Sequence, residues 1–98
     1  MLALEFHPST YQELNDAYRW YELQSAGLGK DFLDELETAY PLIQTMPDTW
    51  PIIFKDFRRY LLKRFPYGVI YQIKADCIWV VAIMHLSRKP DYWVKRMH

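Results

Sequence analysis

The side chains best suited to chemistry lie near the C-terminus, directly after an apolar run. His85, Arg88 and Tyr92 follow one another at spacings of three and four residues. An imidazole can accept or donate a proton near neutral pH. A guanidinium can hold phosphoryl oxygens with two parallel hydrogen bonds, and a phenol can donate a proton or stack on a base. Metal-independent RNA cleavage uses such a base, cation and acid. Alternatively, His85 is structural, Arg88 is a solvated turn residue and Tyr92 packs.

A second group of basic side chains lies earlier in the chain, on a segment with a period of two. Its members are Arg58, Arg59, Lys63 and Arg64. A further basic residue, Lys89, directly follows Arg88. Basic residues interleaved with aromatic ones are typical of nucleic-acid surfaces. We therefore predict one exposed cationic patch beside the end of the last strand, where an anionic ligand would bind. The alternative is an edge strand protected by charge.

The charges divide unevenly between the two halves of the chain. Residues 1–50 hold nine acids and two bases, whereas residues 51–98 hold three acids and ten bases, and the formal net charge is zero. Such asymmetry gives a dipolar surface. The basic half could attract a polyanion or an acidic protein segment, or the two halves could attract each other within the fold.

Composition places the chain among globular proteins and excludes several classes. A length of 98 residues with 51% hydrophobic residues predicts a single domain over residues 1–98. Cys77 is the only cysteine, so no internal disulfide can form. The apolar run 77–84 is far shorter than the ~20 residues of a membrane span, and we expect a soluble cytoplasmic protein. No phosphate-binding glycine loop or metal-ligand spacing occurs, so we predict neither metal nor cofactor.

Helical periodicity indicates two helices in the acidic half. A short strand is predicted within residues 1–6, followed by a helix that starts at a capping box of Ser9 with Gln12 or Thr10 with Glu13. Its apolar stripe is Tyr11, Leu14, Tyr18 and Tyr21. A second helix spans residues 30–44 and buries Phe32, Leu36, Ala39, Tyr40 and Ile43. Pro41 predicts a kink or an earlier end of that helix. The short joint between the helices makes a helical hairpin.

The basic half predicts a loop at residues 46–56 and then an antiparallel meander of strands at 57–64, 67–73 and 77–85. In the last strand, His85 should share a face with Trp79, Val81 and Ile83. That strand is apolar on both faces, as a central strand covered on both sides would be. The helical hairpin can cover one face. Residues 92–98, a second copy of the chain or a partner would cover the other.

The order of these residues resembles the RelE/ParE superfamily of bacterial toxins. The resemblance rests on the run 59–71, an acidic turn at Asp76, the apolar strand and the run 85–93, and it covers nearly the whole chain. These toxins belong to type II toxin–antitoxin modules, including plasmid-stabilisation systems. The resemblance implies an α+β fold, with an N-terminal strand and a helical hairpin packed on a small twisted antiparallel sheet. It also implies an antitoxin, encoded nearby, that wraps the toxin and covers its basic surface.

The resemblance leaves the activity open. RelE-like members cleave mRNA in the ribosomal A site without a metal, whereas ParE-like members inhibit DNA gyrase and are not nucleases. The implied catalytic set is Arg88, His85, Tyr92 and Arg59. The pattern of basic residues, rather than the resemblance, makes Arg58, Lys63, Arg64 and Lys89 the candidates for binding the target. Gly68 and Leu61 stand where those nucleases carry an arginine and a second lysine. A third possibility is an inactive member that only binds a partner and represses its own operon.

Overall fold

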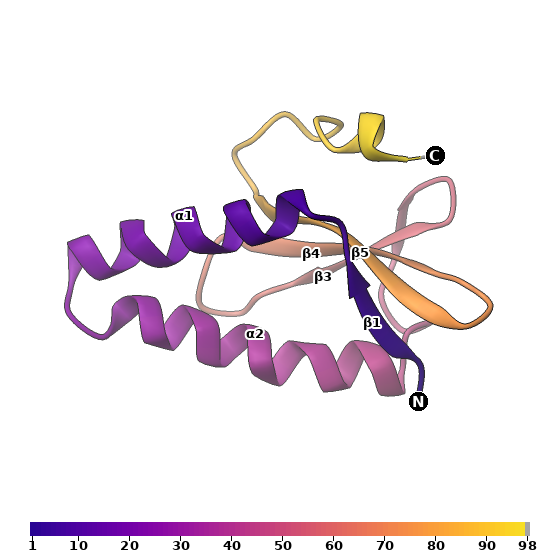
Figure 1. Cartoon of the computed structure of the whole chain (residues 1–98), viewed down its shortest axis with the longest axis horizontal. Helices are drawn as coiled ribbons and strands as arrows, with labels where there is room; N and C mark the ends of the chain where they lie inside the picture. Colours follow the sequence, from indigo (N-terminus) through magenta and orange to yellow (C-terminus); the bar gives the residue numbers. More distant parts are fainter. Residues whose placement is uncertain (98) are drawn as a thin grey trace.

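One mixed sheet and a helical hairpin account for most of the computed structural model, which describes residues 1–97. In chain order the elements are β1 (Ala3–Phe6), α1 (Ser9–Gln24), α2 (Leu28–Thr45), β2 (Ile52–Phe54), β3 (Phe57–Leu61), β4 (Tyr67–Ile73), β5 (Cys77–His85) and a 3₁₀ turn η1 (Val94–Arg96). The strand order is β1-β5-β4-β3-β2, with β1 parallel to β5 and the other pairs antiparallel. The α+β fold predicted from the sequence is therefore confirmed (Figure 1).

The strand predictions hold for β4 and β5 and fail around β3. β3 ends at Leu61 rather than residue 64, because the backbone N–H groups of Lys63 and Arg64 donate to the Glu35 carboxylate of α2 instead of to a neighbouring strand. β2 forms inside the predicted loop and pairs with β3. Since β3 is an interior strand, the alternative of a charge-protected edge is wrong.

A β-bulge in β5 decides which side chains share a face. Ile70 of β4 pairs with Ala82, but the next residue, Tyr71, pairs with Val80, which leaves Val81 as the extra residue. Val81 and Ala82 consequently point to the same side of the sheet, and Ile83 returns to the helix side. The prediction that His85 shares a face with Trp79 and Val81 is wrong for this reason, whereas Ile83 does lie on its side.

The helices differ from the prediction in where they start and in which residues of α1 are buried. Pro8 is the N-cap of α1 and no side chain caps it; the Thr10 hydroxyl donates to the His7 carbonyl (2.7 Å). The buried positions of α1 are Thr10, Ala17 and Tyr21, while Tyr11, one residue off that stripe, is 62% exposed. The predicted capping box and the burial of Tyr11 are therefore wrong.

In α2 the predicted buried positions Phe32, Leu36, Ala39 and Ile43 are confirmed. The helix continues past Pro41 to Thr45, so an earlier end is wrong. Pro41 is exposed, and the buried residues on either side of it in sequence, Ala39 and Ile43, keep this turn packed on the sheet. Gly27, with φ +88°, supplies the left-handed conformation that reverses the chain between the helices.

The sheet carries a hydrophobic core on each face. The helices cover the first face, and the C-terminal segment covers the second with Trp93, which packs on Phe57 (ring centroids 5.0 Å apart). Figure 1 shows this segment on the side of the sheet away from α2. Of the three predicted covers, the C-terminal segment is therefore the one present; His98 lies outside the described residues. Within residues 1–97, no helix combines the length and apolarity that crossing a bilayer demands.

Candidate functional site

The end of β5 and helix α1 enclose a pocket of about 260 Å³, which we call the α1–β5 site. Two residues of the predicted catalytic set, His85 and Arg88, line it together with Tyr67 of β4. Helix α1 contributes Glu13, Asp16, Ala17 and Trp20, and β5 contributes Ile83. Two of the lining residues are thus carboxylates from the acidic half of the chain.

The Glu13 carboxylate is the centre of this site. Its Oε1 accepts hydrogen bonds from the Ile83 backbone N–H (3.0 Å) and from Arg96 Nη1 (3.1 Å). Its Oε2 accepts from the Tyr92 hydroxyl and from Arg96 Nη2 (3.1 Å), and Arg88 Nη1 lies 4.0 Å away. The Glu13 side chain is only 10% exposed and that of Arg96 only 12%. A nearly buried carboxylate is therefore fully occupied by groups of the protein itself.

This arrangement follows from the short length of β1. Just after β1, the His7 N–H donates a hydrogen bond to the Val80 carbonyl. Beyond Val80, no strand within residues 1–97 pairs with this edge of β5. Arg96 Nη1 donates to the Val81 carbonyl (2.9 Å), and Glu13 accepts from the Ile83 N–H. The Glu13–Arg96 pair thus satisfies the backbone groups that β1 leaves uncovered.

Sequence reasoning assigned Glu13 only to helix capping and overlooked Arg96. A signal for Glu13 was present, because it falls between Thr10 and Ala17 on the stripe of α1 that faces the sheet. An acid on a buried stripe needs a charged or hydrogen-bonding partner. Arg96 carried no comparable signal, since its role depends on the path of the C-terminal segment.

The Arg88 guanidinium packs on the ring of Tyr92 in a cation–π contact. The guanidinium carbon of Arg88 lies 3.8 Å from the centre of the Tyr92 ring, and the Arg88 side chain is 53% exposed. Burial, followed by the hydrogen bond to Glu13, raises the pKa of Tyr92 well above its ordinary value. Burial, with smaller contributions from Tyr21, Asp16 and Glu13, raises the pKa of Tyr67 to about 12, against the lowering effect of Arg88. Both phenols are therefore weaker acids than free tyrosine.

The His85 ring is held by the turn that follows it. Its Nδ1 accepts the Ser87 backbone N–H (3.0 Å) and lies 2.7 Å from the Ser87 hydroxyl. Its ring packs edge-on against Tyr67, with centroids 5.0 Å apart. Because Nδ1 is an acceptor, the proton of the neutral ring resides on Nε2.

The other predicted cationic residues do not join this site. Arg58 donates to the carbonyls of Asp48 and Trp50 and lies 3.7 Å from the Asp48 carboxylate, which anchors the loop before β2. Arg64 pairs with Asp31 of α2 at 3.4 Å. Lys63 and Lys89 are exposed. The prediction of one cationic patch is wrong, because acids of α1, α2 and the following loop attract individual arginines to separate places.

Arg59 does not line the α1–β5 site. It projects from β3 into a different pocket, of about 300 Å³, together with Met84 of β5 and with Trp93 of the C-terminal segment. Met84 and Trp93 belong to the second face of the sheet, whereas the α1–β5 site is on the helix side. Of the four predicted catalytic residues, His85, Arg88 and Tyr92 are neighbours and Arg59 is separate.

Comparison with known proteins identifies the family. The family model for the ParE toxin of the type II toxin–antitoxin system parDE matches residues 4–90. The chain belongs to this family. Among solved structures, the chromosomal ParDE toxin–antitoxin system from P. aeruginosa matches with a TM-score of 0.78 and 15% sequence identity, over 89% of this chain and 98% of that one. No curated protein gives a significant match. The predicted membership of the RelE/ParE superfamily is confirmed.

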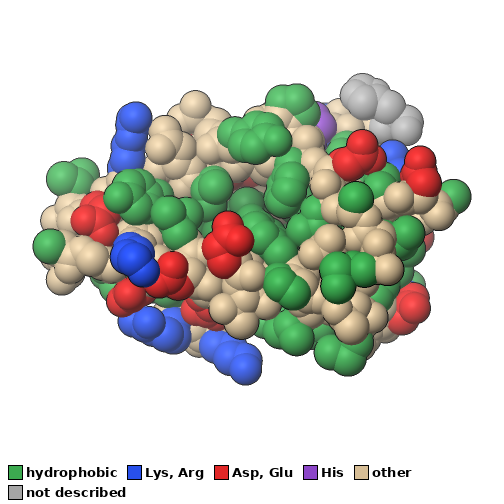
Figure 2. All heavy atoms as spheres, turned by 60° about the horizontal axis from the view of Figure 1, so that its bottom comes forward, with side chains coloured by type: hydrophobic (Ala, Val, Ile, Leu, Met, Phe, Trp, Pro, Cys, Tyr) green, Lys and Arg blue, Asp and Glu red, His purple; other side chains and the backbone are tan. Residues whose placement is uncertain are grey.

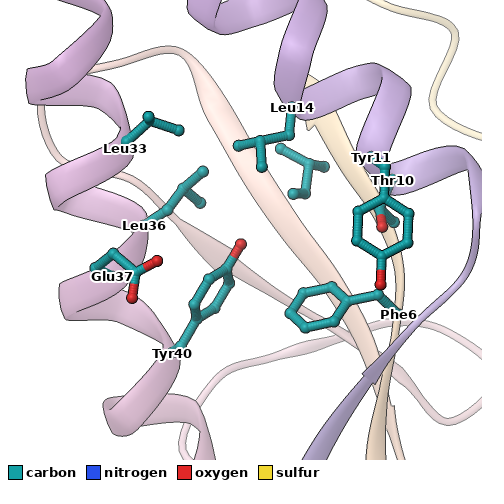
Figure 3. A pocket seen from close by; sticks show the side chains of 9 residues that line it. Phe6, Thr10, Tyr11, Leu14, Leu33, Leu36, Glu37 and Tyr40 are labelled. Carbon is teal, nitrogen blue, oxygen red and sulfur yellow. The ribbon is translucent and has the colours of Figure 1, made fainter.

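This ParE family member also has an apolar groove between its two helices. The groove has a volume of about 220 Å³ and is lined by Phe6, Thr10, Tyr11, Leu14, Leu33, Leu36, Glu37, Tyr40 and Ile83. Figure 3 shows side chains of α1 and α2 facing each other across it, with the Tyr40 ring directed inward and Glu37 at its border. In Figure 2 hydrophobic side chains gather on this face, with acidic side chains beside them. Burial, then the Glu37 charge, raises the pKa of Tyr40 to about 12.

Metal binding finds no support in the side chains of residues 1–97, where no group of three His, Cys, Asp or Glu residues could hold an ion. Cys77 is a buried thiol on β5. The hydrogen bond with Glu5, then burial, raises the pKa of Cys77 to about 11, which favours the unreactive thiol over the thiolate.

Proposed function

We propose that this ParE family member arrests growth by binding DNA gyrase rather than by cleaving mRNA, and that a cognate antitoxin neutralises it. The observation that carries the proposal is the separation of Arg59 from Arg88, which line different pockets. Metal-independent RNA cleavage needs a base, a cation and an acid around one phosphate. Here the cations that such a mechanism would use are divided between two faces of the sheet.

The electrostatics of the α1–β5 site favour the same conclusion. A phosphate approaching Arg88 would meet the carboxylates of Glu13 and Asp16 in the same pocket. These carboxylates would repel the charge that develops on a phosphorane, whereas a nuclease stabilises that charge. The Tyr92 hydroxyl already donates a hydrogen bond to Glu13. The site is better suited to holding the C-terminal segment and presenting Arg88 than to proton transfer.

An inhibitor that binds a protein target needs exposed side chains on a rigid frame rather than a convergent catalytic set. Arg88 is about half exposed, and Lys89 next to it is exposed. Both lie in the turn after β5, an interior strand of this sheet, so their backbone is well positioned. We propose that these two cations contact the target. Lys63 and Arg64, which are exposed in the turn between β3 and β4, would make secondary contacts with it.

The antitoxin is proposed to cover the apolar groove between the helices. Glu37 lines the groove, and the exposed Asp34 lies one helical turn before it on α2. An apolar segment flanked by lysine or arginine would bury its hydrophobic side chains in the groove and pair with these acids. This proposal replaces the earlier expectation that the antitoxin covers a single basic surface, because the structure has no such patch within residues 1–97.

Two parallel assays with purified protein test the target. In a gyrase supercoiling assay we expect inhibition that disappears when the antitoxin is added first. In a translation reaction with mapped mRNA ends we expect no new cleavage at ribosomes. Cleavage at the ribosomal A site without an effect on supercoiling would overturn the proposal and favour a RelE-like activity.

Expression in bacteria separates both toxin activities from the inactive alternative. We expect induction of the wild-type chain to stop growth and co-expression with the antitoxin to restore it. Normal growth at a high level of folded protein, together with binding of the antitoxin, would indicate a member that only binds its partner. Arg19→Gln is a matched control for Arg88→Gln, because both remove one exposed arginine and Arg19 lies on α1, outside the proposed contact surface.

A further inference from the structure

Arg59 differs from the other largely buried arginines. Three arginines are largely buried: Arg58, Arg59 and Arg96. Arg58 has Asp48 and two carbonyl groups, and Arg96 has Glu13 and one carbonyl group. The Nε of Arg59 is buried and has no hydrogen-bond partner among residues 1–97. A buried donor without an acceptor costs on the order of 1–3 kcal/mol, and more when the group is charged, so this position needs an explanation.

The second buried side-chain donor without a partner in the described chain is Trp93 Nε1. Arg59 and Trp93 line the same pocket, of about 300 Å³, on the second face of the sheet. The remaining walls are Ile53, Phe54, Met84, Pro90, Asp91 and Val94. The pocket therefore combines two unsatisfied N–H donors, one of them cationic, with walls that are mostly apolar.

Gly68 makes this position of Arg59 possible. A Cβ atom at Gly68 would lie 3.0 Å from both Cγ and Cδ of Arg59, closer than side chains normally pack. The Arg59 stem therefore lies across the bare backbone of β4 beside the second hydrophobic core. Gly68 stands where RelE-like nucleases carry an arginine, and here its lack of a side chain gives Arg59 room.

We propose that this pocket, which we call the Arg59 pocket, binds a carboxylate attached to an apolar or aromatic group. A carboxylate accepts two parallel hydrogen bonds from one guanidinium, and the indole N–H provides one further donor. One cation balances one negative charge, whereas a phosphate dianion would require more donors than the pocket offers. The apolar walls and the ring of Phe54 would hold the body of the ligand. This proposal does not depend on the choice between gyrase and mRNA.

Asp91 is the one acid that lines the Arg59 pocket. It is exposed and forms no ion pair within 4.0 Å among residues 1–97, so it stands at the mouth rather than on Arg59. Its charge should weaken the binding of an anion. Asp91 could also be a competing internal partner for Arg59, and the experiment must distinguish these two roles.

Titration of the ¹⁵N-labelled full chain with phenylacetate tests the proposal. We expect the Arg59 Nε–H and Trp93 Nε1–H resonances to shift in a saturable manner. Phenylacetamide, which has the same shape without the charge, should bind at least about ten-fold more weakly because its neutral amide cannot form the bidentate ion pair that a carboxylate forms with the guanidinium. The absence of shifts with phenylacetate, or equal binding of phenylacetamide, would overturn the proposal. Tighter binding of inorganic phosphate would overturn the carboxylate assignment.

Four variants locate the site. Arg59→Met keeps the stem and should weaken phenylacetate binding at least about ten-fold; Gly68→Ala keeps the charge but displaces the stem and should weaken binding to a smaller extent. Asp91→Asn should tighten binding. Arg19→Gln removes one exposed charge on α1 and should leave phenylacetate binding unchanged. If Arg59→Met does not fold, the binding measured with Gly68→Ala and with phenylacetamide still tests whether Arg59 holds the carboxylate. A shift of the Arg59 resonance in Asp91→Asn without ligand, with no gain in affinity, would instead assign Asp91 as its partner and overturn the proposal.

The ligand could be a small molecule or the chain end of a protein. A peptide ending in phenylalanine with a free carboxylate carries the same chemistry as phenylacetate. Tighter binding of this peptide than of phenylacetate would support a protein terminus as the source, and weaker binding would support a small carboxylate. In both cases the amidated peptide should not bind, and equal binding of the amidated form would contradict the proposal.

Discussion

Arg96, in η1, and Arg59, on β3, are both largely buried arginines, yet they have opposite surroundings. Arg96 lies at the β5 edge, where both its Nη atoms contact Glu13 and one also reaches the Val81 carbonyl. Arg59 lies on β3, and its Nε has no acceptor within residues 1–97. The difference shows what decides the role of a basic residue. An arginine that meets a carboxylate of the acidic half stabilises the fold, whereas one that meets none stays available to bind a ligand.

The two faces of the sheet explain why the acids reach one arginine and not the other. The acidic helices lie on the first face and bring Glu13 to the edge of β5. The second face is covered by the short segment around Trp93, and Asp91 is the acid that the described part of the chain brings to the Arg59 pocket. Substitutions on the two faces should therefore differ in their effect on stability and on function.

Trp93→Ala should have the largest effect, because it removes the main cover of the second face. Trp93 is 1% exposed and packs against Phe57 and Phe54. Truncation of a buried tryptophan typically costs about 3–5 kcal/mol, and we expect a loss of this size in urea unfolding. Trp20→Ala is the matched control, since Trp20 is 58% exposed on α1, and should cost less than about 1 kcal/mol. Similar losses in both variants would mean that the two faces do not differ in this way.

Glu13→Gln should have the next largest effect, because it removes the negative charge beside a nearly buried Arg96. The amide can accept only part of the four hydrogen bonds that the carboxylate accepts, so we expect a loss of about 2–4 kcal/mol. Chemical denaturation measures it.

The control for this prediction is Glu37→Gln, which removes an exposed acid from α2 and should change stability by less than about 0.5 kcal/mol. A double-mutant cycle with Arg96→Gln should give a coupling of on the order of 1 kcal/mol or more. Additive losses would show that Arg96 does not depend on Glu13, and the contrast with Arg59 would fail.

The sequence predicted the elements whose pattern is local and missed those that depend on tertiary contacts. β4 and β5 were found because β-branched and aromatic residues end at a clear turn near Asp76. β2 was missed because three exposed apolar residues after Pro51 pair only with β3. An apolar run gives no sign of the bulge at Val81. Because of this bulge, Trp79 and His85 lie on opposite faces of the sheet, contrary to the prediction.

The candidate site was predicted in part. His85, Arg88 and Tyr92 were expected together and do lie together, since they follow one strand end at short spacing. Arg59 was assigned to the same site because its neighbours in sequence are basic, but it lies on the opposite face of the sheet. No local pattern indicates which carboxylate will reach which arginine. The pairing of Glu13 with Arg96 joins residues at the two ends of the chain and could not be read from either end alone.

Arg88→Ala should separate function from stability at the α1–β5 site. The Arg88 side chain is 53% exposed and 4.0 Å from Glu13, so we expect a stability change of about 0–1 kcal/mol. Growth arrest on induction should nevertheless be lost, because Arg88 is the cation proposed to contact the target. Arg96→Ala, which removes the other arginine of the same carboxylate, should instead lower the melting temperature. Continued growth arrest by Arg88→Ala would remove Arg88 from the functional site.

The smallest predicted effect concerns alkaline pH. In the folded chain the pKa of Tyr67 is about 12, against 10.0 for the free residue. Between these values the unfolded chain releases the phenolic proton while the folded chain retains it, so the folded state binds more protons and loses stability as pH rises. The stabilisation is complete below pH 10 and disappears as pH rises through about 12. Tyr67→Phe should reduce this alkaline loss of stability.

Substitution of Arg88 or of Arg59 tests whether the pKa of Tyr67 depends only on charges on its own face of the sheet. Arg88 lowers the pKa of Tyr67, since its charge favours the phenolate. Arg88→Ala should therefore raise that pKa further, and Arg59→Met should not change it, because Arg59 lies across the sheet in another pocket. The ultraviolet absorbance of the phenolate, taken as the difference between each variant and its Tyr67→Phe counterpart, measures the shift. Equal shifts in the two variants would mean that the two arginines act on one shared electrostatic environment, contrary to the division between the faces.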